Sequence, residues 1–307
     1  MKIGLYSITY LGIWYDGPAL TWKEVLQRAK DLGYDGVEFD GKRPHANPMD
    51  WDPRTRDAVR NEAARLGLEI PAIASNNDFS SPVPEHRECQ LLMVREQARL
   101  AADLGARVVR LFAAWPGITF RDGQAAYEEA HQGWERAYPD VPRWTRWRLV
   151  RDCLQEAARF GEEFGVVMAL QNHAPVIHHW KDCYDLVREV NSPWLKVCLD
   201  LPIMTRYDPE WVRQAVSTVG TLQAHSHFGG EFYRDGAGRV QLRPSSSGRP
   251  LPDYASFVRW MQEVGYDGYL CYEFCHPAVD ENHNPAGIDF VHGHAAMALE
   301  FMRGIII

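Results

Sequence analysis

Four short apolar runs in the second half of the chain each end in a polar residue that is able to bind a metal ion. The final residues are Gln171, Asp200, His227 and Glu273. Such runs are typical of buried strands, and the ends of parallel strands in a barrel meet at one catalytic rim. An amide oxygen, two carboxylates and an imidazole together predict a site for one divalent metal ion. Mn²⁺ is expected first, with Mg²⁺, Co²⁺ and Zn²⁺ as alternatives.

Two further histidines lie close to these predicted ligands. His173 follows Gln171 by two residues, and His225 precedes His227 by two. Residues two apart in a strand point to the same face, so both imidazoles are expected at the barrel mouth. His173 is a candidate catalytic base or acid, beside Glu273, because imidazole titrates near neutral pH. A substrate hydrogen bond or a structural role is its alternative, and His225 is expected to contact substrate or support the site.

Other side chains at or just after predicted strand ends form a hypothesis for sugar contacts, together with His225. They are Glu38, Arg43, His45, Asn76, Trp115 and Arg234. Rim loops are polar in any barrel, so each of these residues has a structural alternative. Arg43 and its neighbour Lys42 also leave a sugar phosphate open as substrate.

The elements that must position these residues are marked by a repeating pattern in which a helical segment ends in glycine and a strand follows. Glycine suits the left-handed position that ends a helix. The pattern predicts eight strands, near 2–9, 36–39, 69–74, 107–113, 166–171, 195–201, 222–227 and 268–273. It predicts helices near 21–32, 54–66, 86–104, 145–164, 180–190, 209–219, 254–264 and 290–303. Eightfold alternation indicates an α/β chain forming a single (β/α)8 TIM barrel over residues 1–307. A doubly wound sheet is the alternative, but no glycine-rich phosphate motif follows the first strand.

Two predicted connections are longer than links need to be. Residues 114–144 follow the fourth strand and are rich in aromatic residues, and residues 228–253 follow the seventh and contain a hairpin signal at Asp235-Gly236. Long loops at this rim usually act as lids or substrate walls. The aromatic residues are alternatively the core of a small packed subdomain.

Composition limits the class of partner. The 307 residues carry a net charge of −8 without a basic run, which argues against binding nucleic acid. No stretch approaches the roughly 20 apolar residues of a membrane span, and no signal peptide is evident. The six cysteines lack metal-knuckle spacing and are expected to be reduced thiols of a cytoplasmic protein.

The segments Leu170-Gln-Asn-His173, Cys198-Leu-Asp200 and His225-Ser-His227, with Glu273 and the two Gly-Tyr-Asp-Gly repeats, carry a family resemblance. Nearly the whole chain resembles the xylose-isomerase-like family of sugar isomerases and epimerases. The resemblance implies that the ends of strands five to eight supply Glu, Asp, His and Glu to one metal ion. Gln171 replaces the first Glu here, and Met204 stands where the family often has a histidine.

The replacement at residue 171 bears on the mechanism. A glutamine oxygen still ligates a hard cation, but the amide does not exchange protons near neutral pH. Family epimerases invert a carbon between two opposed carboxylates, so a missing one favours deprotonation followed by elimination. The sequence is also similar to the barrel subunits of C-glycoside deglycosidases, which implies lyase-type cleavage of a 3-keto-C-glucoside and a small β-rich partner subunit.

Three alternatives stay open beside that hypothesis. The first is a ketose epimerase or aldose–ketose isomerase that acts on free sugars. The second is a non-catalytic sugar-binding barrel with a decayed site, which metal content would distinguish. The third, a phosphodiesterase barrel with three zinc ions, is disfavoured because it needs more rim histidines and a basic face. An oligomer and a small-molecule sugar or glycoside ligand are expected in the catalytic cases.

Overall fold

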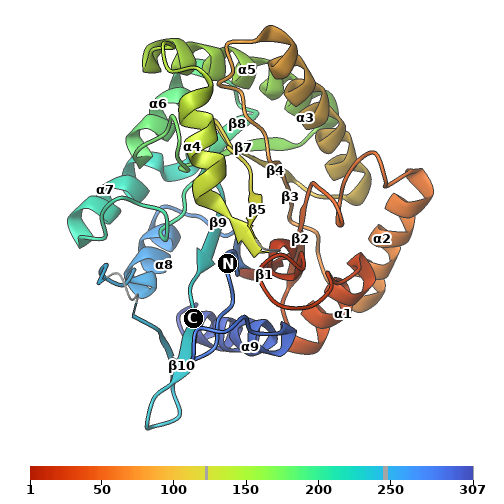
Figure 1. Ribbon diagram of the computed structural model, residues 1–307, viewed down its shortest axis with the longest axis vertical. Coiled ribbons are helices and arrows are strands. Elements are labelled where there is room, and N and C mark those ends of the chain that lie inside the picture. The colour runs from red at the N-terminus through yellow and green to blue at the C-terminus, as the bar shows by residue number, and fades with distance from the viewer. Residues whose placement is uncertain (122–123, 245–247, 307) are drawn as a thin grey trace.

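Eight parallel strands form a closed barrel in the computed structural model, which describes residues 1–121, 124–244 and 248–306 (Figure 1). Around the barrel the order is β1-β12-β9-β8-β7-β4-β3-β2. The strands are β1 (Lys2–Tyr6), β2 (Gly36–Asp40), β3 (Ala72–Ala74), β4 (Val108–Leu111), β7 (Val167–Gln171), β8 (Leu195–Cys198), β9 (Gln223–Gly229) and β12 (Tyr269–Glu273). The predicted (β/α)8 TIM barrel is confirmed.

Eight helices follow the barrel strands in the positions expected from the sequence. They are α1 (Trp22–Leu32), α2 (Pro53–Leu66), α3 (Pro84–Leu104), α5 (Arg143–Phe164), α6 (Trp180–Val190), α7 (Pro209–Val219), α8 (Tyr254–Glu263) and α9 (Ile288–Arg303). Thr21 and Glu24 form a reciprocal capping box at the start of α1, and Gly33 ends that helix with φ 94°. The capping box and the left-handed glycine therefore set the two ends of α1, which is why the sequence predicted this helix closely.

Small buried side chains lie one inward-facing position below the polar strand ends. Ala169 precedes Gln171 by two residues and Cys198 precedes Asp200 by two, and both join Ala72 and Val108 in one buried cluster. Alternate residues of a strand share a face, so this cluster is the layer beneath the predicted ligands. The polar side chains at the barrel mouth thus lie directly above a layer of buried apolar side chains.

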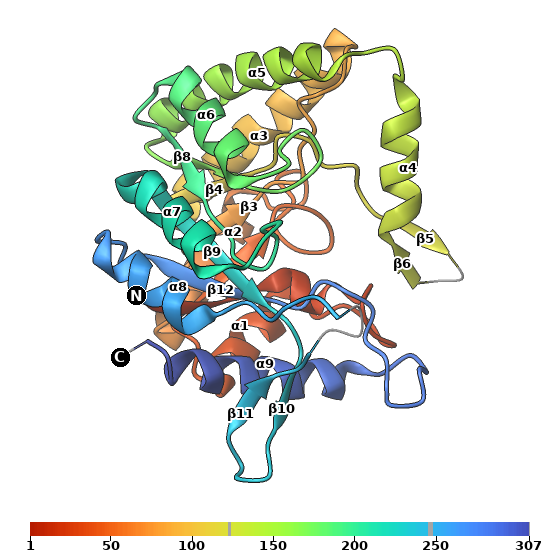
Figure 2. The ribbon, with the colours of Figure 1, turned by 90° about the vertical axis from the view of Figure 1, so that its left-hand side faces the viewer.

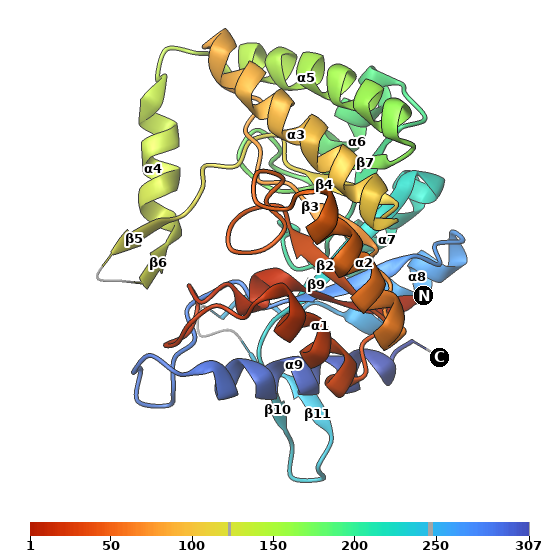
Figure 3. The same ribbon diagram turned by 90° about the vertical axis from the view of Figure 1, so that its right-hand side faces the viewer.

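The long segment after β4 crosses the barrel mouth and contains a helix that the sequence did not reveal. It comprises the paired strands β5 (Thr119–Arg121) and β6 (Gln124–Ala126) and helix α4 (Tyr127–Ala137). Figures 2 and 3 show α4 at the barrel end opposite the chain termini. The Tyr127 hydroxyl donates to the carbonyl of Cys275 (2.8 Å), and Trp134 Nε1 donates to Asp78 (3.1 Å). These contacts tie the described part of the segment to the loops after β12 and β3, and residues 122–123 lie outside the described residues.

The long segment after β9 takes a different course. The predicted hairpin exists as β10 (Phe232–Arg234) and β11 (Val240–Leu242). It packs beside α9 and projects past it (Figure 2). The hairpin therefore lies beside α9 on the outer side of the barrel, and residues 245–247 of the predicted loop lie outside the described residues.

All six cysteines are free thiols, as expected, and four of them are buried. Among the residues that the structure describes, no helix combines the length and apolar character that a membrane crossing requires.

Candidate metal and catalytic site

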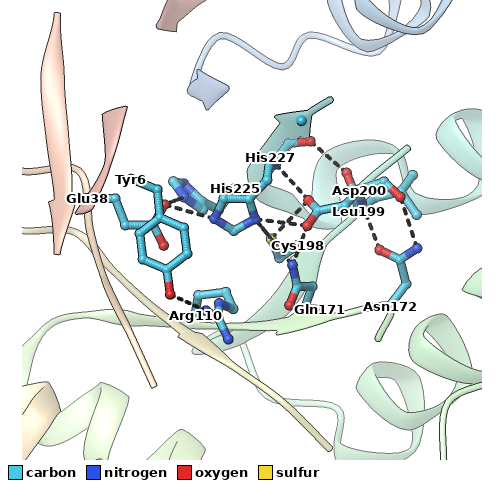
Figure 4. Close-up of polar contacts among 12 residues, drawn as sticks. Tyr6, Glu38, Arg110, Gln171, Asn172, Cys198, Leu199, Asp200, His225 and His227 are labelled. Atoms are coloured by element: carbon cyan, nitrogen blue, oxygen red, sulfur yellow. Dashed lines mark hydrogen bonds and ion pairs between the residues drawn. The ribbon is translucent and has the colours of Figure 1, made fainter. Parts of the chain in front are cut away.

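Three of the four predicted ligands meet at the carboxyl ends of β7, β8 and β9. Asp200, just past β8, accepts a hydrogen bond from Nδ1 of His227 on its Oδ2 atom (2.8 Å). The amide of Gln171 donates to the same oxygen, and the backbone N–H of His227 donates to Oδ1 (2.7 Å) (Figure 4). All three side chains are almost completely buried. The strand ends therefore converge as the sequence predicted.

Two neighbouring side chains hold Asp200 in place. The Asn172 side-chain oxygen accepts from the backbone N–H of Asp200 (2.7 Å), and its amide donates to the Asp200 carbonyl (3.1 Å). The Cys198 thiol donates to Asp200 Oδ1 (3.4 Å). The orientation of the carboxylate is thus fixed by β7 and β8 before any ligand binds. The sequence analysis did not anticipate these two roles, although both residues stand in the segments that carry the family resemblance.

Charge pairing dominates the electrostatics of this cluster. Burial alone would raise the pKa of Asp200, but the His227 imidazole and several hydrogen bonds hold it below its ordinary value. Burial would lower the pKa of His227, but the carboxylates of Glu38 and Asp200 raise it well above its ordinary range. Without a metal ion, His227 is therefore an imidazolium between two carboxylates, and a bound cation must displace its proton.

The residues present fit a divalent cation. Gln171 Oε1 is buried and has no hydrogen-bond partner in the described part of the chain. A buried acceptor without a partner is uncommon in a folded protein, and an amide oxygen is a normal ligand for hard cations. In addition, the candidate ligand atoms of Cys198, Asp200 and His227 lie within 4.8 Å of one another. The amide of Gln171 therefore lies beside these atoms through its nitrogen, which donates to Asp200 Oδ2, and its oxygen is left without a partner.

Glu273, the fourth predicted ligand, ends β12 on the strand beside His227. It pairs in register with Gly229, and it belongs to neither of the two potential metal-binding groups found among the described residues. Burial raises its pKa to about 7, with the charge of Asp200 adding to the effect and that of His227 opposing it. A carboxyl group with this pKa exchanges protons readily near neutral pH. The role of Glu273 as a base therefore stays a prediction that its raised pKa supports.

His173 lies beside aromatic side chains at the mouth and makes no hydrogen bond to the cluster. Its Nδ1 contacts the carbonyl oxygen of Ala174, which only accepts, so Nδ1 carries the hydrogen and Nε2 keeps the lone pair. Its ring meets Phe112 (4.9 Å between centroids) and Trp115 (5.2 Å) edge to face. Burial lowers its pKa to about 4, so the imidazole is neutral at physiological pH. His173 and Trp115, both predicted for the mouth, are thus brought together there.

Glu38 and His225 were expected to contact sugar, but the structure places them inside the barrel. Glu38 is 0% exposed, and its Oε2 atom accepts from Nε2 of both His225 and His227, each at 2.8 Å. Burial would raise the pKa of Glu38, but His227 and His225 hold it well below its usual range. The contact partners of Glu38 are therefore imidazoles, which corrects the expectation.

The two arginines predicted for substrate binding are engaged elsewhere. Arg43 forms a bidentate pair with Asp50 (2.6 and 2.8 Å) on the surface. Arg234, in β10, pairs with Glu300 of α9 (2.7 Å), because the hairpin packs along the outside of the barrel. Neither arginine joins the cluster of Gln171, Asp200 and His227.

His45 and Asn76 also form local contacts. His45 is 1% exposed, and its Nε2 meets the carbonyl oxygen of Leu20 (3.0 Å). Asn76, which is half-buried, donates to Asp40 Oδ1 (2.6 Å). Both side chains support the loops after β2 and β3 rather than the predicted metal site.

Sequence analysis missed a buried tyrosine and arginine opposite the cluster. Arg110 donates to the Tyr6 hydroxyl (2.8 Å) and to the carbonyl of Ser75 (2.9 Å), and it lies over the Phe112 ring. The Tyr6 ring is 5.4 Å from that of His227. A charged residue within the apolar run of β4 was the available signal, because an unpaired buried charge is costly.

Comparisons with known proteins agree with this architecture. A family model described as "Xylose isomerase-like TIM barrel" matches residues 26–297. L-ribulose-5-phosphate 3-epimerase UlaE of Escherichia coli O139:H28 is 23% identical over 210 residues, covering 66% of each chain, just under two thirds of the relative's length. Among solved structures, D-psicose 3-epimerase from Clostridium cellulolyticum H10 has a TM-score of 0.70 at 17% identity, covering 100% of this chain and 99% of the other. The 3-keto-D-glucoside 4-epimerase YcjR from E. coli has a TM-score of 0.66 at 18% identity, with 97% and 99% covered.

Proposed function

The chain belongs to the xylose isomerase-like TIM barrel family, and we propose that it is a divalent-metal-dependent enzyme that removes a proton next to the carbonyl of a keto-sugar. The observation that carries the proposal is the buried cluster of Asp200 and His227, beside which the Gln171 amide has an oxygen without a hydrogen-bond partner. Gln171, Asp200, His227 and Glu273 would hold the ion. When bound, it supplies Lewis-acid polarisation of the sugar carbonyl, which acidifies the neighbouring C–H bond.

Glu273 is the proposed base. Its pKa is about 7 in the metal-free chain, and a bound cation would favour the ionised form that accepts the substrate proton. His173 offers Nε2 as a second acceptor, held in that tautomer by the carbonyl of Ala174. Its lowered pKa makes it a weaker base than Glu273, so its proposed task is to orient a hydroxyl and pass a proton.

The amide at residue 171 favours elimination over inversion. Glu273 takes the proton from the carbon beside the carbonyl, and the electron pair of that C–H bond forms the enediolate. Inversion then requires a proton from the opposite face, which Gln171 does not supply. Expulsion of the substituent from the β-carbon instead forms a C=C bond, while the leaving carbon keeps the electron pair of the broken bond and takes up the proton held by Glu273. The proposed reaction is therefore the lyase-type cleavage of a 3-keto-C-glucoside.

Aromatic side chains at the mouth support a flat leaving group. Phe112 and Trp115 stack with centroids 4.8 Å apart and planes 13° apart, and Tyr127 of α4 meets Trp115 edge to face. Such surfaces favour planar apolar groups. A small β-rich partner subunit and an oligomeric assembly belong to this proposal. The second candidate, sugar epimerisation by the chain alone, is favoured by the activities named for the relatives UlaE and YcjR.

One experiment separates the candidates. The purified protein, its metal content measured, is incubated in D₂O with a 3-keto-C-glucoside and with free ketoses. Metal-dependent release of the aglycone supports the lyase, and deuterium entering an epimerised free ketose supports the epimerase. The binding-barrel hypothesis gains if no metal binds after reconstitution and no proton exchanges.

A further inference from the structure

Glu38 on β2 contacts the predicted metal ligand His227 on β9, a strand that does not neighbour its own. Strands β2 and β9 are not neighbours, since β1 and β12 separate them on one side of the barrel. The Glu38 side chain nevertheless crosses the interior to meet both His225 and His227 (Figure 4). All three side chains are at most 1% exposed. The hydrogen bonds of Glu38 to the two histidines therefore lie inside the barrel, away from solvent.

The hydrogen-bond chemistry fixes which nitrogen of His227 is available to a cation. A carboxylate only accepts, so the Nε2 atom bonded to Glu38 must carry a hydrogen. The opposite nitrogen, Nδ1, faces Asp200 Oδ2 (2.8 Å) and the Gln171 amide (3.3 Å). The ring therefore presents Nδ1 to the predicted ligand cluster.

His225 strengthens this arrangement without entering the cluster. Its ring lies 5.0 Å from that of His227, at 82° between the planes, so the two Nε2 atoms approach the same Glu38 oxygen from different directions. Two donors on one oxygen hold the carboxylate against rotation. The Glu38 carboxylate is thus restrained by one histidine while it orients the other.

We infer that Glu38 is a positioning residue that holds His227 with Nδ1 directed at the metal ion, and that His225 keeps Glu38 in place. The inference rests on the proposed function and deepens it. A carboxylate behind a ligating histidine fixes the ring and increases its basicity, and loss of such a partner typically weakens metal binding about 10- to 100-fold. The role of Glu38 is therefore in metal affinity rather than in contact with the sugar.

The test compares Glu38→Gln with the matched control Asp40→Asn. Asp40 is a buried carboxylate two residues along the same strand, but its hydrogen-bond partner is Asn76 and not an imidazole. Zn²⁺ affinity is measured by competition with a chelator. Glu38→Gln is expected to weaken it at least about tenfold, since a neutral amide oxygen accepts more weakly than a carboxylate and no longer increases the basicity of the ring. Asp40→Asn is expected to change it less than about threefold, which separates positioning from a general loss of negative charge.

Nitrogen-15 NMR of the histidines in the zinc-loaded wild-type protein gives a readout that does not depend on a variant. The expected result is a zinc-bound Nδ1 and a protonated Nε2 on His227. Zinc on Nε2, unchanged affinity in Glu38→Gln, or a second zinc ion held by Glu38 would each overturn the inference. If the wild type binds no zinc, the proposed function itself fails, whereas normal wild-type binding with an unaffected Glu38→Gln refutes the positioning role alone.

Discussion

Replacing Glu273 by glutamine should stabilise the metal-free protein, increasingly so as the pH rises from about 4.5 to 7. The pKa of Glu273 is about 7 in the folded chain against an ordinary value of 4.5, because burial penalises its charge. Each pKa unit corresponds to about 1.4 kcal/mol, so full ionisation in the folded state costs about 3 kcal/mol. Below pH 4.5 the group is protonated in both states and costs nothing. Between pH 4.5 and 7 the folded state binds more protons, so its stability falls as pH rises.

The assay is thermal unfolding in a chelator at pH 5 and pH 8. The difference in unfolding free energy between Glu273→Gln and wild type should increase by about 2 kcal/mol from the lower to the higher pH, or about 4 °C in Tm for a chain of this size. The control, Glu281→Gln, replaces an exposed carboxylate and should show no such change. With saturating Mn²⁺ the wild type should become more stable than Glu273→Gln, because a bound ligand stabilises only the chain that binds it well. A pH-independent difference in chelator would refute the assignment of Glu273 as a carboxyl titrating near neutrality, and with it the argument for the base.

Three further substitutions test the site. Asp200→Asn should weaken metal binding at least about 100-fold, as measured by chelator competition, because it removes the central charged ligand; retained metal and turnover would contradict the assignment. His173→Ala should lower kcat at least about 100-fold while elemental analysis still finds metal, and wild-type turnover would exclude His173 from proton transfer. Gln171→Glu should give epimerisation, seen as inverted product by NMR, if the missing carboxylate steers the chain to elimination; continued aglycone release without inversion would oppose that explanation.

Strand positions and the converging ligands were predictable because both depend on local pattern. Apolar runs ending in Gln171, Asp200 and His227 define where three adjacent strands stop, and the closed barrel then brings those ends together. Glycine at helix ends, as at Gly33, fixed the boundaries to within a few residues. Period and capping are short-range properties, so one sequence suffices to recognise them.

The roles of Glu38 and Arg234 were not predictable in the same way. Whether a polar residue at a strand end faces solvent or another side chain depends on partners far along the chain: Glu38 meets residues 187 and 189 positions away. Arg234 was assigned to the rim because its loop follows β9, but the hairpin bonds to Glu300 on α9. Contacts between residues far apart in the sequence therefore determine where both side chains lie, and the periodicity of the sequence does not predict such contacts.

The amide at residue 171 also sets the charge of the proposed centre. Asp200 and Glu273 together supply two negative charges, which match a divalent cation, whereas the family's usual third carboxylate would leave the centre negative. Fewer anionic ligands leave the ion a stronger Lewis acid, although they bind it less tightly. In the metal-free chain, a carboxylate at 171 would face Asp200 directly, where the amide now donates a hydrogen bond. Gln171 thus stabilises the metal-free cluster, and in the proposed mechanism it would keep an oxygen for the ion and favour carbonyl polarisation while giving up the proton transfer that inversion needs.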